Sequence, residues 1–173
     1  MKMTIDDFVK WIYPQAKKIG EISPIFVTSQ AALESGWGKS AIGKNLFGIT
    51  KGSSWKGKTQ LVTTTEYFST PGVRFSSPES VIKVVKISDK RYKYTVKRLF
   101  RDYESVANCL EDHLAILKKP QFADAWPYRN DAKQYVRKIQ NAIGGKYATS
   151  PSYVDTMDKM FQIVINSIQK QKL

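Results

Sequence analysis

Two glutamates stand in contrasting sequence surroundings that suit acid–base chemistry. Glu34 lies seven residues after Val27 and three after Ala31, so a helix would place the three side chains on one face. A carboxyl on that face points to a core or a cleft rather than to open water. Burial raises the pKa of a carboxyl, as a general acid requires near neutral pH. The competing interpretation is an exposed glutamate near a helix C-terminus.

The residues directly after Glu34 favour a site at the end of this helix. Gly36 and Gly38 allow the chain to turn sharply beside the acid. Trp37 between them offers a flat apolar face, a common partner for a sugar ring. The alternative is that Trp37 belongs to the core.

The second glutamate, Glu66, lies in a threonine-rich segment with strand composition, where hydroxyls and solvent favour an ionised carboxylate. Two carboxylates in contrasting environments are typical of glycoside hydrolysis: one protonates the leaving oxygen, and the other activates water or stabilises positive charge. A separation of ~6.5–9.5 Å would favour inversion, and ~5–5.5 Å would favour retention. The alternative is that Glu66 is an ordinary surface residue.

Cys109 and His113 are four residues apart and predict neighbours on one helix face. The favoured interpretation is a core thiol beside a half-buried imidazole, with zinc binding or thiol catalysis as the alternative. A single cysteine excludes an intrachain disulfide, and a single histidine excludes a histidine-rich metal site.

The elements that must position these residues follow from caps and periodicity. Helices are predicted over 4–20, 23–36, 105–117 and 131–143, with Ile143 facing inward on the fourth, and a last helix is predicted to begin at 150 and to continue through Ile168. Strands are predicted at 59–68 and, as a pair turning near Ser88, within 81–100, and loops at 41–54 and 69–80. Helices flanking a small β region indicate an α+β domain. The boundary between the two parts is a natural cleft for a polymer.

The composition fits one domain of 173 residues with a real core, since 42% of the residues are hydrophobic. A net charge of +13 predicts attraction to anions. Much of the charge forms a basic cluster, which can be a solvated face, an attachment to an anionic cell envelope, or a nucleic-acid site, the envelope being preferred. The basic cluster comprises Lys83, Lys86, Lys90, Arg91, Lys93, Lys97, Arg98 and Arg101.

The N-terminus carries two acids and no apolar region, so no signal peptide is predicted, and no apolar stretch approaches the ~20 residues of a membrane span. We therefore expect synthesis in the cytoplasm.

Several motifs resemble the glucosaminidase family of peptidoglycan hydrolases, glycoside hydrolase family 73, which includes flagellar muramidase domains and phage endolysins. The first is the run 29–38, which contains Leu-Glu-Ser-Gly-Trp-Gly, followed by Asn-Leu-Phe-Gly-Ile at 45–49. Matches then continue at 55–58, at 64–67 and in Phe-Arg-Asp-Tyr-Glu-Ser at 100–105. The last is Tyr-Ala-Thr at 147–149, with Pro151 and Tyr153 after it.

The resemblance implies a lysozyme-like fold, mainly helical with a small β-hairpin lobe flanking the active-site cleft. It implies that Glu34 is the catalytic acid, Glu66 the second carboxylate and Tyr147 a catalytic cleft tyrosine. It implies no cofactor and no metal. The substrate-binding residues that it indicates are Trp37, Asn45, Phe47, Tyr67, Tyr103 and Tyr153.

The β lobe departs from the family pattern through an insertion at about 69–94, so Glu79 and Asp89 are rivals of Glu66. Glu66 is preferred because its Thr-Glu-Tyr context is intact and Glu79 follows a loop proline.

The implied activity is cleavage between N-acetylglucosamine and N-acetylmuramic acid in peptidoglycan strands. Muramidase or lytic transglycosylase specificity and a non-catalytic wall-binding or nucleic-acid-binding module are the alternatives. Substrate-assisted catalysis, with Tyr147 orienting the N-acetyl group, is open beside inversion and retention. Residues 1–173 are expected to form one catalytic domain, monomeric, without nucleic-acid binding. We expect it to act on the cell wall after release, through a holin-like route or a secretion system.

Overall fold

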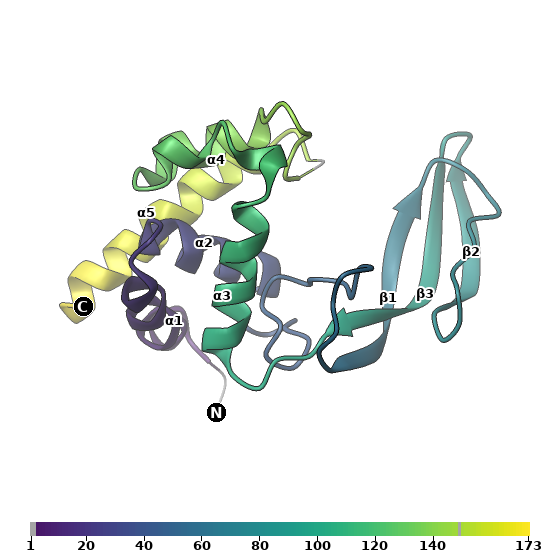
Figure 1. Ribbon diagram of the computed structural model, residues 1–173, viewed down its shortest axis with the longest axis horizontal. Helices are drawn as coiled ribbons and strands as arrows, with labels where there is room; N and C mark the ends of the chain where they lie inside the picture. The colour runs from purple at the N-terminus through teal and green to yellow at the C-terminus, as the bar shows by residue number, and fades with distance from the viewer. Residues whose placement is uncertain (1–2, 149) are drawn as a thin grey trace. The chain divides into compact units, whose positions relative to one another are not determined.

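The computed structural model describes residues 3–148 and 150–173, and its internal contacts divide the chain into two compact units. The first, the helical unit, comprises Met1–Phe47 and Glu104–Leu173, and the second, the strand unit, comprises Gly48–Tyr103 (Figure 1). The predicted boundary between the helices and the β region falls at the limits of these units.

The helical unit is built around one nearly enclosed helix. The α2 helix (Pro24–Ser35) packs against α1 (Ile5–Ile19), α4 (Ala132–Gln140) and α5 (Tyr153–Gln171). The α3 helix (Val106–Leu117) packs on α1 and leads into short 3₁₀ turns at Pro120–Phe122 and Trp126–Tyr128. Five α-helices and a three-stranded sheet in the described residues confirm the predicted mainly helical α+β class.

Local chemistry sets the ends of the first two helices. Thr4 and Asp7 form a reciprocal capping box at the start of α1, and Gly20 ends it in the left-handed conformation. Ser23 accepts a hydrogen bond from the Phe26 N–H at the start of α2. Both helices match their predicted ranges because these signals are contained in neighbouring residues.

Burial of α2 continues around most of its circumference. Residues 26–32 are all buried, and the Phe26 ring packs edge-on against Tyr135 at 4.9 Å between centroids. Small residues such as Ala31 and Ala32 let neighbouring helices approach closely. A helix held from several sides has little freedom to move its C-terminal end.

The strand unit is an antiparallel sheet of β1 (Thr59–Phe68), β2 (Ser80–Ser88) and β3 (Arg91–Arg101) in the order β1-β3-β2. It confirms the strand at 59–68 and the pair within 81–100. Loop 69–79 packs on one face, which we call the inner face: the Tyr94 hydroxyl donates to the Thr70 carbonyl, and Phe68 contacts Phe75 edge-on. The β region is thus a three-stranded sheet rather than a simple hairpin.

The predicted helix over 131–143 is too long. The α4 helix ends at Gln140, and Ile143, expected to face inward, is 93% exposed. The chain turns back after α4, since the Tyr147 N–H donates to the Ile139 carbonyl. The last helix begins at Tyr153 rather than at residue 150, and Thr149 lies outside the described residues.

Cys109 and His113 lie in the core of the helical unit, as the favoured interpretation expected, although His113 is fully rather than half buried. The His113 ring stacks on Phe47 at 3.7 Å between centroids. Burial raises the pKa of the Cys109 thiol to about 12 and lowers that of His113 to about 3. The thiol is therefore protonated, and the imidazole is neutral near pH 7.

Within the described residues, none of the helices combines the length and apolarity needed to cross a bilayer.

We predict that His113 makes the free energy of unfolding depend on pH below about 6.5. The unfolded chain protonates this ring near its ordinary pKa of 6.5, whereas the folded chain does so only near 3. The unfolded state therefore binds more protons between these values, and stability falls as the pH decreases. The expected loss is about 2 kcal/mol between pH 6.5 and 4.5, measured by urea titration.

The His113→Phe and His113→Gln variants should flatten this slope, and an unchanged slope in whichever variant folds would contradict the assignment. Carboxylates with lowered pKa values add their own loss at lower pH, and these are Asp6, Asp7, Glu79 and Asp131.

Candidate active site

Glu34 occupies the last turn of α2, where the buried helix reaches solvent. The residue is exposed, yet desolvation by the surrounding protein raises its carboxyl pKa. No described residue forms a hydrogen bond or an ion pair with this carboxyl. Glu34 is thus a poorly hydrated acid that solvent can reach, so of the two expected surroundings, core or cleft, full burial in the core is excluded.

Trp37 follows Glu34 in an uncommon backbone conformation. Its φ is 60°, in the left-handed region that large side chains rarely adopt. The Trp37 N–H donates to the Ala32 carbonyl, and its half-buried ring meets Phe8 edge-on at 5.7 Å. The turn therefore holds Trp37 close to the acid in sequence while part of the ring supports the core.

Two predicted tyrosines of the helical unit lie within electrostatic range of Glu34. The pKa values of Tyr147 and Tyr153 are raised mainly by desolvation, and the Glu34 carboxylate contributes to both shifts. Their rings lie 6.0 Å apart between centroids. The structure thus brings Glu34, Tyr147 and Tyr153 together, and both phenols keep their protons near neutral pH.

Two further side chains orient these tyrosines. Gln30 Nε2 donates a hydrogen bond of 2.6 Å to the Tyr153 hydroxyl oxygen, which leaves the Tyr153 proton available to another acceptor. The Tyr147 hydroxyl lies 3.5 Å from His113 Nε2. The sequence motifs did not indicate a role for Gln30, and they favoured a core position for His113, with zinc binding or thiol catalysis as the alternative.

Asn45 and Phe47 lie in the turn after α2, and both are buried. The backbone of Asn45 exchanges hydrogen bonds with Ile42 at 2.9 and 3.3 Å. Phe47 carries the stacked His113 ring. Phe47 therefore supports Tyr147 indirectly, because it packs against the imidazole that lies next to the Tyr147 hydroxyl.

In the strand unit, Glu66 shares an arginine with one of its rivals. Arg98 Nη1 lies 2.7 and 2.8 Å from the two carboxylate oxygens of Glu66, and Arg98 Nε lies 2.8 Å from Glu79 Oε1. The Phe75 ring lies under the guanidinium at 4.7 Å. The sequence counted Arg98 only as a member of the basic cluster, because the pairing depends on a strand register that spans 32 residues.

The two rivals differ in their surroundings. Burial raises the pKa of Glu79, but the Leu99 N–H and the Arg98 guanidinium outweigh it, so the pKa lies below its ordinary value. Asp89 lies in the β2–β3 turn, where its side chain is 95% exposed and pairs with Lys86. Glu79 therefore adjoins the Glu66 pair, whereas Asp89 is an ordinary turn residue.

The structure separates Tyr67 and Tyr103 from the Glu66 carboxylate. Tyr67 follows Glu66 in β1 and points to the opposite face, where it is 52% exposed and lies under Arg91 at 4.6 Å. Tyr103 is buried and packs edge-on against Trp55 at 5.6 Å. Tyr67 is available for contact with a ligand, and Tyr103 supports the fold of the strand unit.

Glu34 belongs to the helical unit and Glu66 to the strand unit. The choice between inversion and retention, which depends on their separation, stays a prediction.

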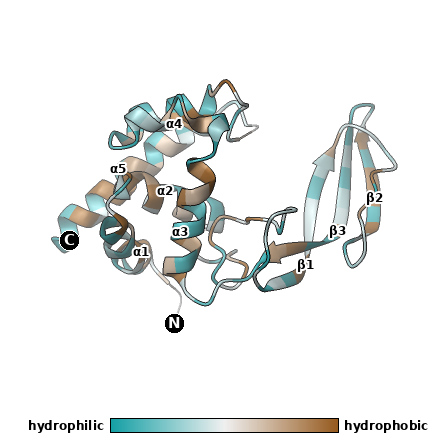
Figure 2. Ribbon diagram, viewed as in Figure 1, coloured by the Kyte–Doolittle hydropathy of each residue, from teal (hydrophilic) through white to brown (hydrophobic). Residues whose placement is uncertain are grey.

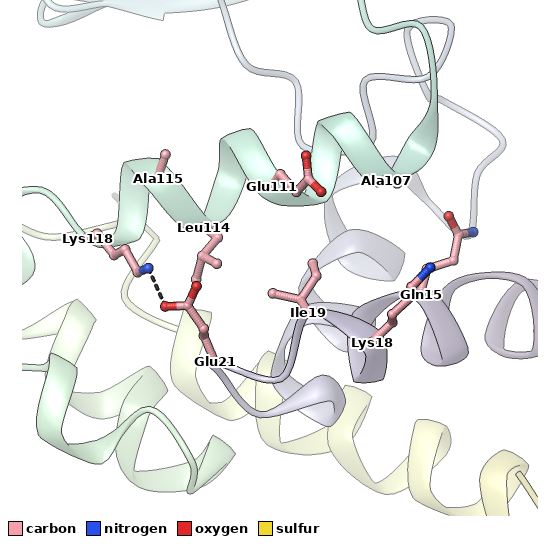
Figure 3. A pocket seen from close by; sticks show the side chains of 9 residues that line it. All are labelled: Gln15, Lys18, Ile19, Glu21, Ala107, Glu111, Leu114, Ala115 and Lys118. Carbon is pink, nitrogen blue, oxygen red and sulfur yellow. Dashed lines mark hydrogen bonds and ion pairs between the residues drawn. The ribbon is translucent and has the colours of Figure 1, made fainter.

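The helical unit also has a groove of about 670 Å³ between α1 and α3 (Figure 3). The Lys118 side chain forms an ion pair with Glu21 at its edge. None of the residues predicted for the site lines this groove, so its size alone does not make it the candidate centre. The described residues also include no cluster of three histidine, cysteine or acidic side chains that could hold a metal ion.

Comparison with known proteins shows the family of the chain. A family model described as "Glucosaminidase: Mannosyl-glycoprotein endo-beta-N-acetylglucosaminidase" matches residues 10–165. The chain is 31% identical to "Peptidoglycan hydrolase FlgJ" of Salmonella typhimurium over 167 residues, covering 90% of this chain and 45% of the relative. It is 29% identical to "Probable N-acetylmuramidase" of Lactococcus lactis subsp. cremoris, covering 88% of this chain and 32% of the relative. The chain thus spans less than half the length of these curated relatives.

Solved structures extend the likeness to the fold. The glycoside hydrolase domain of Salmonella typhimurium FlgJ superposes with a TM-score of 0.71 at 28% identity, covering 98% of this chain and 94% of that one. A mutant peptidoglycan hydrolase from Sphingomonas sp. A1 gives a TM-score of 0.69 at 28% identity, with 95% and 99% covered. The resemblance inferred from the motifs is confirmed, and the chain belongs to the glucosaminidase family of glycoside hydrolases.

Proposed function

We propose that this chain hydrolyses β-1,4 glycosidic bonds in the glycan strands of peptidoglycan and so lyses bacterial cell walls. Relatives from Salmonella typhimurium and Sphingomonas sp. A1 carry the name peptidoglycan hydrolase. The observation that carries the proposal is Glu34, a solvent-accessible carboxyl whose pKa is raised by desolvation beside two protonated tyrosines.

Glu34 is the general acid in this proposal. A carboxyl with a raised pKa keeps its proton closer to neutral pH and can deliver it to the glycosidic oxygen as the bond breaks. Since no described cation pairs with Glu34, nothing favours premature loss of that proton. Tyr147 and Tyr153 act as neutral hydrogen-bond donors toward the sugar, and Gln30 directs the Tyr153 proton away from itself.

Glu66 is the second carboxylate, which activates water or stabilises the positive charge that develops on the sugar. Only one nitrogen of Arg98 contacts both of its oxygens, so other lone pairs stay open to a water molecule. Arg98 acts as a positioning residue, and Glu79 and Phe75 hold its guanidinium.

The bond proposed is the one that follows N-acetylglucosamine, as in an endo-β-N-acetylglucosaminidase. The relative named N-acetylmuramidase makes cleavage after N-acetylmuramic acid the alternative. Mass spectrometry of digested, purified peptidoglycan distinguishes the two by the sugar at the new reducing end. Anhydro ends would indicate a lytic transglycosylase, and an absence of products would indicate a binding module.

We predict that Glu34→Gln lowers the rate of peptidoglycan hydrolysis at least ~100-fold, because the leaving oxygen loses its proton donor. The melting temperature at pH 7 should stay equal or rise, since the variant removes a poorly hydrated charge. Release of reducing ends from purified sacculi and a thermal melt test both points. Glu111→Gln is the matched control, and a Glu34→Gln enzyme with full activity would overturn the assignment.

We predict that Glu66→Gln strongly lowers kcat, whereas Glu79→Gln has a small effect. The kcat of Arg98→Lys should lie between those of the two glutamate variants. An ammonium keeps the charge but lacks the planar guanidinium, whose nitrogens contact both Glu66 and Glu79. The kcat of each variant on sacculi is the measurement. The reverse order for Glu66 and Glu79 would move the second carboxylate into the insertion.

A further inference from the structure

The face of the sheet opposite the inner face, which we call the outer face, is open to solvent. Alternation along β1 and β3 places Glu66, Tyr94 and Arg98 on the inner face, under loop 69–79. On the outer face, the positions from Leu61 to Tyr67 of β1 are exposed, and those from Arg91 to Lys97 of β3 are exposed or half-buried. Its residues are Leu61, Thr63, Thr65 and Tyr67 of β1, Arg91, Lys93, Thr95 and Lys97 of β3, and Lys83 and Val85 of β2.

The structure divides the basic cluster into paired and unpaired members. Arg98 binds two carboxylates on the inner face, Lys86 pairs with Asp89, and Arg101 is buried against Trp55. Lys90 lies in the β2–β3 turn and does not belong to the outer face. The four cations of the outer face have no ion-pair partner among the described residues. These four are Lys83, Arg91, Lys93 and Lys97, and the inner-face acids do not neutralise them.

The register sets the spacing of three of these charges. Lys83 lies beside Thr95, which stands between Lys93 and Lys97 in β3. The Cα atoms of diagonal neighbours across antiparallel strands are ~7–8 Å apart, so the backbone of Lys83 is this close to those of Lys93 and Lys97. Like charges at this spacing repel one another, and a polyvalent anionic surface would relieve the repulsion.

Beside these cations, β2 is exposed along its whole length although more than half of its side chains are aliphatic (Figure 2). Ile82 and Ile87 are 53% and 52% exposed and stand at the two irregularities in the β2–β3 register. By the β2–β3 register Val85 lies on the outer face, whereas Val81 and Val84 stand opposite Val96 and Tyr94 of the inner face. Soluble proteins rarely expose several aliphatic side chains of one short strand without a partner. The other exposed aliphatic residues of β2 are Val81, Val84 and Val85.

We propose that the strand unit binds the surface of an anionic lipid bilayer through the lysines of its outer face together with Ile82, Val85 and Ile87 of β2. The four unpaired cations complement acidic headgroups, and the adjacent isoleucines reach the boundary between headgroups and acyl chains. The outer backbone edge of β2 has no strand partner in the described structure, so contact stays at headgroup depth, where water still satisfies its N–H and C=O groups.

A lipid surface accounts for both components of this region. A soluble polyanion such as nucleic acid would bind the lysines and leave the exposed aliphatic side chains of β2 in contact with water. Tyr67 is also the one aromatic ring among the outer-face residues defined above, and Arg91 already covers it, which disfavours base stacking.

The test is sedimentation of the full chain with vesicles of phosphatidylcholine containing 30% phosphatidylglycerol, compared with pure phosphatidylcholine. A triple variant Lys83→Gln, Lys93→Gln, Lys97→Gln should weaken binding to the anionic vesicles on the order of 100-fold. A matched triple variant in the helical unit, Lys10→Gln, Lys133→Gln, Lys159→Gln, removes the same charge and should change binding far less.

The double variant Ile82→Thr, Ile87→Thr should weaken vesicle binding roughly 10-fold and should not alter the salt dependence. If only the lysine variant loses vesicle binding, and the parent chain binds single-stranded DNA as tightly as anionic vesicles, the ligand is any polyanion rather than a lipid. That result would overturn the proposal. Equal binding by the two lysine triples would overturn it too. Binding without peptidoglycan tests this surface separately from hydrolysis, and the Glu34→Gln protein should bind vesicles as the parent does.

Discussion

The site in the helical unit depends on the enclosure of α2. A helix that packs against α1, α4 and α5 must fill its circumference with apolar and small residues, and only its C-terminal turn can offer an acid to solvent. Glu34 stands in that turn, so its carboxyl is reachable but poorly hydrated. The same enclosure presents Gln30 to Tyr153 across 123 residues of sequence, which ties the start of α5 to the helix that carries the acid. The raised pKa of Glu34 therefore comes from desolvation by the protein around the end of α2.

The two candidate acids are supported by opposite means. Glu34 has no cation beside it in the described structure, and desolvation governs its proton affinity. Glu66 contacts a guanidinium through both of its oxygens, on the face of the sheet that loop 69–79 covers. A catalytic pair benefits from such an asymmetry because one member has to keep a proton while the other has to attract positive charge.

Local signals in the sequence predicted most of the fold. Ser23 with Pro24 and the glycines at 20 and 36 set helix ends correctly because a cap acts within one turn. Ile143 continues the helical periodicity of α4, but the chain turns back after Gln140 and the Tyr147 N–H bonds to the Ile139 carbonyl. Hydrophobic periodicity does not predict a turn of this kind. The sequence identified Glu34, Glu66 and Tyr147 by motif, whereas the partners that orient them required contacts between residues distant in the chain. Arg98 is the clearest example, since its role appears only when β1 and β3 are aligned.

The Arg98 contacts have a consequence for protein engineering. Loop 69–79 and β2 look like a detachable module, and a chimera designed to shorten the sheet to a plain hairpin would remove Glu79 and Phe75 with them. Arg98 would then lose two of the groups that hold it, and its guanidinium would be free to rotate around its remaining contact with Glu66. The insertion is therefore not a modular appendage: trimming it would loosen the side chain that orients the second acid, even in a chimera that keeps every residue of β1.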